Sequence, residues 1–272
     1  MRDTVYVVLV AQRTVGSAVH AELIERARGI CGRDNVVTDP VLLSVYRSDG
    51  VRRPQRDLPL AALLPASGGE VADLVKACAE AKVDWKVRGA GTSQSGGALA
   101  GAGEVLIVMS RMRGILAGLN ADGEINAQPG VSLGVLAALH PARWLTQAPP
   151  AATLGGHIGQ TRGLRVLRAA QLVLADGQIS EISASTPGYD LCGAFCGSRG
   201  EAGIAISLTV ALADAGSLSD AAPLDCPVTL SAAAAQDGGA LQLRGDAAGL
   251  SGTVRQSAAP APDGAVRRCE GR

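Results

Sequence analysis

Four glycines and three hydroxyl side chains are concentrated in the ten-residue stretch RGAGTSQSGG, Arg88 to Gly97. Glycine lets the backbone adopt positive φ and approach a ligand closely, and successive N–H groups of such a turn can form an anion-binding nest. Thr92, Ser93 and Ser95 add hydroxyl donors, and we expect Arg88 to offset negative charge at the mouth of the loop. The composition indicates a loop that holds a phosphate or pyrophosphate, although an ordinary flexible turn between strands has the same composition.

Two common phosphate-binding patterns fit this loop poorly. The nucleotide P-loop ends in a lysine followed by Ser or Thr, and no lysine follows these glycines. The dinucleotide fingerprint G-x-G-x-x-G begins well at Gly89 and Gly91, but Gln94 stands where the third glycine belongs. Gly96 and Gly97 also disfavour the helix that should open there. The remaining interpretation is a loop that wraps a pyrophosphate with its own backbone amides and without a helix.

The segments before the loop predict a strand, a helix and a second strand. Leu60 to Leu64 is a short apolar run that Pro65 closes, and Asp84 to Val87 begins another strand. Between them, SGGEVADLVKACAEAK places its apolar residues at helical spacing. A unit of this kind favours a small parallel sheet, with the glycine loop directly after its second strand.

The later part of the chain predicts antiparallel pairing. A strand is expected at Val105 to Met109, then a hairpin that turns at Ala121-Asp122-Gly123, and a helix over Val131 to Leu139. A second hairpin and a last strand are expected at Arg165 to Leu174, Gln178 to Ile182 and Ile204 to Leu212. Parallel strands first and antiparallel strands later define an α+β fold rather than a doubly wound sheet.

Both ends of the chain differ from this central part. Ser17 can cap a helix that runs to about Arg28, with Gly29 and Gly32 available to end it. From about Ala213 onward, small residues and proline dominate and the periodicity fades. We therefore expect an N-terminal helical segment over residues 1–37, a folded domain over 38–213 and a low-complexity, disordered tail over 214–272.

Composition excludes several classes of function. The 272 residues carry 25 basic and 25 acidic side chains and only 2% aromatic residues, which excludes nucleic acid as the main partner. The apolar run VYVVLV near the N-terminus is too short to span a membrane and lacks a cleavage pattern for a signal peptide. The six cysteines are scattered without a C-x-x-C pair, so we expect buried thiols, no metal site and a cytoplasmic location, at most peripheral to the inner membrane.

Several segments share their order and spacing with a known family. They are TDPVLLSVYRSDG, LPLAALLPASGGEVADLVKAC, the loop RGAGTSQSGG, VLIVMSRMRGIL, AQPGVSLGVLAAL, TLGG and GYDLCGAFCGSRGEAGIA. Together they resemble the FAD-linked oxidase family with a PCMH-type, vanillyl-alcohol-oxidase-like flavin domain. Within it, the chain is most similar to the glycolate oxidase FAD-binding subunits and D-lactate dehydrogenases. The likeness covers about Thr38 to Leu212.

This resemblance implies a PCMH-type fold with a small parallel-stranded subdomain and a larger antiparallel-sheet subdomain, and FAD held between them. The glycine loop would wrap the pyrophosphate, TLGG would flank it and the flavin, and the last motif would lie beside the adenine and ribose. The implied cofactor-binding residues are Arg88, Gly89, Ala90, Gly91, Thr92, Ser93, Gln94, Ser95, Gly96, Gly97, Thr153, Leu154, Gly155, Gly156, His157, Gly197, Ser198, Gly203 and Ile204. Family members that attach flavin covalently through this loop use a histidine within it, and this loop has none, so FAD is expected to be bound non-covalently.

The chain departs from the family pattern at two positions in these motifs. His157 replaces an asparagine after TLGG, and Arg199 stands where the family tends to have an acid. Of the three histidines, His20 and His140 are expected to have packing or helix-end roles, and His157 alone would lie near the flavin. A hydrogen-bonding role for His157 is favoured over that of a catalytic base, and no catalytic residue is assigned.

The family further implies an activity. It would be oxidation of a 2-hydroxy acid, glycolate or D-lactate, by hydride transfer to flavin, in a complex with other oxidase subunits that include an iron-sulfur subunit. The family's cap domain is not recognisable after Leu212. The alternative is therefore a truncated, non-catalytic remnant that keeps the fold and FAD binding.

Overall fold

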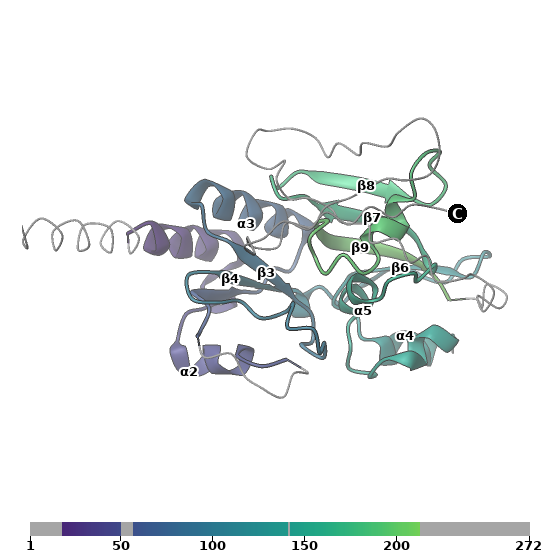
Figure 1. The fold of residues 1–272 in the computed structure, drawn as a ribbon, viewed down its shortest axis with the longest axis horizontal. Helices are drawn as coiled ribbons and strands as arrows, with labels where there is room; N and C mark the ends of the chain where they lie inside the picture. Colours follow the sequence, from purple (N-terminus) through teal and green to yellow (C-terminus); the bar gives the residue numbers. More distant parts are fainter. Residues whose placement is uncertain (1–17, 50–56, 141, 213–272) are drawn as a thin grey trace, which may run out of the picture. The chain divides into compact units, whose positions relative to one another are not determined.

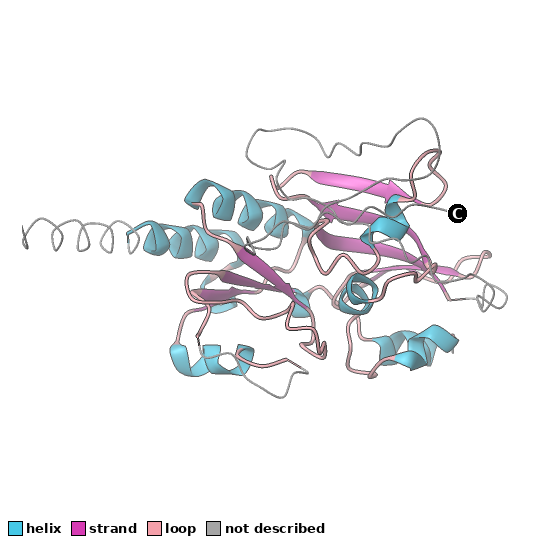
Figure 2. Cartoon of the chain, viewed as in Figure 1, coloured by secondary structure: helices cyan, strands magenta, loops and turns pink. Residues whose placement is uncertain are grey.

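A computed structural model of the chain describes residues 18–49, 57–140 and 142–212. These residues build one sheet of four strands and one of five, with helices packed around them (Figures 1 and 2). The expected α+β fold class is confirmed. The expectations for Ser17, for the apolar run near the N-terminus and for the tail from residue 214 lie outside the described residues.

The four-stranded sheet carries the glycine loop. Its strand order is β1 (Val36–Val37), β2 (Ala61–Leu63), β4 (Val105–Val108) and β3 (Trp85–Arg88). Strands β2, β4 and β3 are parallel, as expected, and β1 pairs antiparallel with β2. Every residue of β2 and β4 is buried. The glycine loop follows β3 directly, and β3 pairs along its whole length with the fully buried strand β4.

Helix α3 (Gly68–Ala81) makes the crossover between β2 and β3. Ser67 caps it, since its Oγ accepts a hydrogen bond from the Glu70 N–H at 3.2 Å. The Glu70 carboxylate in turn accepts from the Ala66 N–H at 2.9 Å, which completes a reciprocal cap. The predicted strand, helix, strand unit is confirmed.

The N-terminal helix, described over residues 18–31, packs on the same core. Leu23, Ala27 and Cys31 are buried in one cluster with residues of α3 and β2. An ion pair between Arg26 and Glu80 joins this helix to α3, and the two helices lie side by side in Figure 1. The helix ends at Gly32, which has a φ of 86°, and not at Gly29, because tertiary packing outweighs the weak helix propensity of one glycine. Short helical turns η1 (Arg33–Asn35), α2 (Pro40–Leu43) and η2 (Ser44–Tyr46) follow before β2.

The five-stranded sheet is antiparallel throughout. Its order is β5 (Ile115–Ala117), β6 (Glu124–Ala127), β9 (Ile204–Ala211), β7 (Leu167–Val173) and β8 (Ile179–Ser183). Both predicted hairpins, β5 with β6 and β7 with β8, are confirmed. Central strand β9 is the last predicted strand, and it is buried over almost its whole length.

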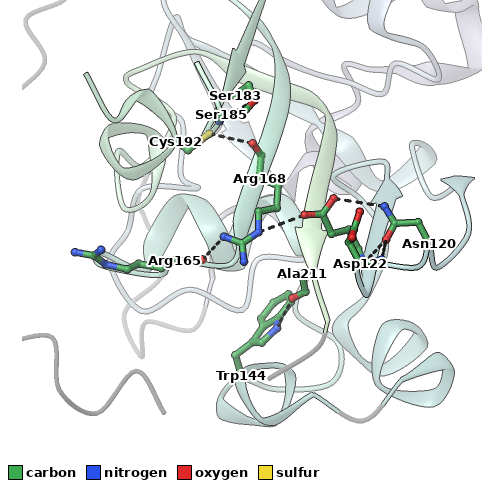
Figure 3. Close-up of polar contacts among 10 residues, drawn as sticks. Asn120, Asp122, Trp144, Arg165, Arg168, Ser183, Ser185, Cys192 and Ala211 are labelled. Atoms are coloured by element: carbon green, nitrogen blue, oxygen red, sulfur yellow. Dashed lines mark hydrogen bonds and ion pairs between the residues drawn. The ribbon is translucent and has the colours of Figure 1, made fainter. Parts of the chain in front are cut away.

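Short helices precede or connect the strands of this sheet. They are η3 (Met109–Arg111), α4 (Leu133–Leu139), η4 (Arg143–Gln147), α5 (Leu154–Gln160) and α6 (Leu191–Phe195). Trp144 of η4 donates a hydrogen bond from Nε1 to the Ala211 carbonyl at 3.1 Å, which fastens η4 to the end of β9 (Figure 3). Arg168 of β7 lies 3.4 Å from the Glu124 carboxylate of β6 across the same sheet (Figure 3).

Two further findings bear on function. Within the described ranges, no helix combines the length and the apolar character that crossing a bilayer requires. The four cysteines in those ranges, Cys31, Cys78, Cys192 and Cys196, are buried free thiols.

Candidate functional site

A cleft of about 500 Å³ brings together three segments that lie far apart in the sequence. Such a volume lies within the range of ordinary cofactor sites. The glycine loop contributes residues 89–95, and helix α5 with its cap contributes Thr153, Gly155, Gly156, His157, Gly159 and Gln160. The segment before β9 contributes Arg199, Gly200 and Gly203, and the first two residues of β9, Ile204 and Ala205, complete this side. These are the three segments in which the sequence placed its candidate binding residues.

The glycine loop contributes backbone amides to this cleft. It contains no helix, and Gly91 and Gly96 have φ values of 70° and 75°, which are accessible to glycine at little cost. Within the part of the chain that the structure describes, none of the five N–H groups from Ala90 to Gln94 donates to another protein group. Successive free amides on a glycine-rich turn are the donor set that an anion prefers.

Two serines fix the far end of the loop. Ser93 and Ser95 hydroxyls lie 2.9 Å apart, and the Ser95 and Gly97 N–H groups donate back to these hydroxyls at 3.1 and 3.3 Å. Ser95 Oγ also donates to Gln160 Oε1 of α5 at 2.9 Å, so the loop is tied to the opposite wall of the cleft. This network holds the loop in shape before any ligand binds.

Arg88 does not lie at the mouth of the loop, and this expectation is wrong. Its side chain is buried and donates to the carbonyls of Ser48 and Ala98, at 2.7 and 3.3 Å. Its guanidinium carbon lies 5.6 Å from the centroid of the Tyr46 ring. Burial lowers the pKa of Arg88, and the Asp49 carboxylate opposes that shift. The guanidinium is therefore held by the protein behind the loop, where it supports Gly91.

The second segment begins as a helix cap and not as a simple turn. Thr153 precedes α5, whose Leu154 and Ile158 are fully buried. The helix forms despite its glycines because Gly155 packs on Pro129; a Cβ at Gly155 would lie 2.6 Å from the proline Cβ. Close packing also joins this segment to the loop, since a Cβ on Gly89 would overlap Thr153 Oγ1 and lie 3.2 Å from Thr153 Cβ.

The second and third segments each carry a buried hydroxyl that has no partner in the described part of the chain. Among the described residues, Thr153 Oγ1 and Ser198 Oγ are shielded from solvent and make no hydrogen bond. Burying a hydroxyl without a partner costs about 1–3 kcal/mol. Such groups are retained most readily where a ligand can use them.

His157 lines the cleft from α5. Its ring stacks on Trp144, with centroids 5.9 Å apart and an interplanar angle of 11°. Its Nε2 is buried and has no hydrogen-bond partner in the described part of the chain. Burial lowers the pKa of His157, so the imidazole is neutral at physiological pH. Since Trp144 is itself fastened to Ala211, the orientation of His157 is set by the end of β9.

The third segment is held against the other two through its backbone. The Gly197 N–H donates to the Ile158 carbonyl at 3.0 Å, and the Arg199 N–H donates to the Gly159 carbonyl at 2.7 Å. Gly200 packs against Val87 of β3, just before the glycine loop. The end of α5, the loop and this segment therefore form one connected wall.

Most of the predicted binding residues line the cleft, and some lie behind it. Arg88, Gly96, Gly97, Leu154, Gly197 and Ser198 are not among the lining residues. The sequence did not predict a further group of lining residues, namely Val87, Ala98, Pro129, Ala148, Pro149, Ala152, Gly159, Gln160, Phe195, Arg199, Gly200 and Ala205. Most of these are apolar or small, and only the tertiary structure brings them together.

Comparison with known proteins identifies the family that this part of the chain resembles. Residues 59–183 match the family described as FAD binding domain. Over 186 residues the chain is 31% identical to glycolate oxidase subunit GlcD of Escherichia coli (strain K12), a match that covers 61% of this chain and 37% of that protein. It is 29% identical over 210 residues to the D-lactate dehydrogenase of Anaerostipes hadrus, covering 71% of this chain and 44% of that enzyme.

Solved structures show the same fold at lower identity. Alkyldihydroxyacetonephosphate synthase matches with a TM-score of 0.61 at 18% identity, over 70% of this chain and 40% of that one. Substrate-bound p-cresol methylhydroxylase matches with a TM-score of 0.57 at 18% identity, over 72% and 43% of the two chains. The chain spans about two fifths of the length of the curated relatives named above.

Proposed function

We propose, on the premise that residues 59–183 form the PCMH-type FAD-binding domain of the FAD-linked oxidases, that the cleft binds FAD non-covalently. We further propose that the protein takes part in oxidation of a small 2-hydroxy acid. The observation that carries the proposal is the convergence of the glycine loop, α5 and the segment before β9 on one cleft.

The residues present fit this cofactor. Five backbone amides in the loop, which have no partner among the described residues, provide donors for a pyrophosphate. The buried Thr153 hydroxyl, also without a partner there, lines the same cleft. No histidine lies between Arg88 and Gly97, which supports non-covalent binding. When bound, FAD supplies the two-electron acceptor for a hydride.

The chain's own groups would bind and orient the cofactor. The loop amides hold the anionic centre, and the Ser95–Gln160 hydrogen bond keeps the loop closed against α5. His157 presents a neutral ring from the α5 wall in a fixed orientation. Apolar residues such as Phe195 and Ile204 line the rest of the cleft and limit the access of water.

The 2-hydroxy-acid substrate rests on the relatives. Two of them are named as a glycolate oxidase subunit and a D-lactate dehydrogenase, and a third, of Bos taurus, as a mitochondrial D-2-hydroxyglutarate dehydrogenase at 27% identity. The first is named as a subunit, which supports action within a complex. Glycolate and D-lactate are therefore the first substrates to test.

A second candidate is an FAD-binding protein that does not turn over substrate by itself. It is favoured by the chemistry of the cleft, since no carboxylate or thiol side chain is among its described lining residues. Among the described residues that line the cleft, His157 is also the only side chain that could act as a general base, and burial lowers its pKa.

One experiment separates these candidates. The purified chain is reconstituted with FAD, freed of excess flavin and mixed anaerobically with glycolate, D-lactate or D-2-hydroxyglutarate. Bleaching of the flavin absorbance by any of these acids supports the oxidoreductase, and bound flavin that no acid bleaches supports the second candidate. Acid treatment should release all of the flavin, and flavin that stays attached to the chain would contradict non-covalent binding.

A further inference from the structure

Arg199 occupies a costly backbone conformation in the wall of the cleft. Its φ is 58°, in the left-handed region that costs a non-glycine residue about 1–2 kcal/mol. The other positive φ angles of this segment, at Gly197, Gly200 and Gly203, all belong to glycines. Arginine is thus present at a position where glycine would be less strained. Strain of this kind at a binding site indicates that the side chain has a use.

The same residue carries the charge of the cleft. Of the described residues that line it, Arg199 alone has a formal charge at neutral pH, because the others are apolar, small or neutral polar residues and a neutral His157. The guanidinium of Arg88 is engaged by the Ser48 and Ala98 carbonyls behind the loop. The charge that the sequence assigned to Arg88 is therefore available only from Arg199 within this lining.

The backbone of Arg199 is fixed beside the glycine loop. Its N–H donates to the Gly159 carbonyl of α5 at 2.7 Å, and the next residue, Gly200, packs on Val87 at the base of the loop. Its side chain is exposed, so binding an anion costs the guanidinium little desolvation free energy. A guanidinium is the side chain best suited to phosphate, since it donates two parallel hydrogen bonds.

From these observations we infer that Arg199 is a ligand-binding residue that contacts the phosphate groups of the dinucleotide. This role rests on the proposed function. It makes the cleft selective for a phosphorylated ligand over an uncharged one.

The test compares Arg199→Gly, Arg199→Asn and Arg199→Lys with the wild type. Binding of FAD, of ADP and of uncharged riboflavin is measured by fluorescence or calorimetry at two salt concentrations. Arg165→Gln is the matched control, because Arg165 is an exposed arginine outside the cleft whose side chain extends away from its neighbours in Figure 3. It removes the same net charge from the protein.

We expect the Gly and Asn variants to bind FAD and ADP about tenfold more weakly and with a smaller salt dependence. Riboflavin binding should be unchanged, and Lys should retain most of the salt dependence. The apo Gly variant should unfold at the same temperature as wild type or higher, because relief of strain offsets the added freedom of its unfolded chain. If the Gly variant does not fold, the Asn variant carries the test, since asparagine tolerates the left-handed region.

The results distinguish a failure of the role proposed for Arg199 from a failure of the proposed function. If the wild type binds FAD, and the uncharged variants bind it equally well with the same salt dependence, the role of Arg199 is refuted and the proposed function stands. If the folded wild type binds none of the three probes, the proposed function itself fails.

Discussion

The contact between Gly89 and Thr153 joins the glycine loop to the α5 wall, and replacing Gly89 with alanine tests it. Gly89 has no positive φ, so Gly89→Ala introduces no backbone strain. Its new Cβ would overlap Thr153 Oγ1 and lie 3.2 Å from Thr153 Cβ. Thr153 is buried and β-branched, so it cannot move aside freely. Overpacking of this kind costs about 1–3 kcal/mol.

Urea unfolding of the apo protein measures this cost. Thr153→Ala removes the overlapping hydroxyl, so the double variant should recover most of the loss, with a coupling energy of about 1–3 kcal/mol. Gly29→Ala is the matched control, because Gly29 lies in the N-terminal helix with nothing within 4 Å of a new Cβ. It should stabilise by up to about 1 kcal/mol. If Gly89→Ala is as stable as wild type, or if Thr153→Ala does not rescue it, the packing described for this junction is refuted.

Three further predictions follow from side chains around the cleft and in the core. Burial lowers the pKa of His157 below its unfolded value of about 6.5, so the unfolded state takes up a proton first as the pH falls. Urea unfolding at a series of pH values should therefore show that wild type loses more stability than His157→Asn from about pH 6.5 downward. Equal losses would contradict the neutral buried ring. Ser95→Ala removes the hydrogen bond to Gln160 Oε1, so it should cost at most about 1 kcal/mol of stability. It should nevertheless weaken FAD binding several-fold, because the loop is then less ordered before FAD binds. Unchanged FAD affinity would show that the network does not order the loop. Burial raises the pKa of Cys78 and of Cys196 to about 12, which disfavours their reactive thiolate form. In a variant with serine at positions 226 and 269, the remaining four thiols should react slowly with Ellman's reagent in the native protein and rapidly only in urea. Fast reaction of the native protein would refute their burial.

The sequence predicts the regular elements well because their signals are local. Ser67 and the apolar spacing of the next helix define α3, and the turn residues at Asp122-Gly123 and Asp176-Gly177 define both hairpins. In the antiparallel strands, apolar residues either alternate with polar ones, as in the half-buried β6, or run almost continuously, as in the buried β9. The glycine loop could likewise be assigned to a ligand before its surroundings were known.

The wall of the cleft could not be predicted in the same way. Arg88 looks like a charged residue at the edge of a loop, but the Ser48 and Ala98 carbonyls hold it inside the protein, and Ser48 lies forty residues away in the chain. Helix α5 is rich in glycine and so has no helical signal of its own; its packing on Pro129 supplies the stability. The strained φ of Arg199 has no signature in sequence, because it depends on contacts with Gly159 and Val87.

The glycine loop, α5 and the segment before β9 together form the proposed FAD site. Amide hydrogen exchange of the purified chain, measured with and without FAD, tests it most directly. FAD should slow exchange in all three segments, and most strongly at Ala90 to Gln94, whose N–H groups have no partner among the described residues. FAD binding that leaves these five amides unprotected, or no binding by the folded chain, would contradict it.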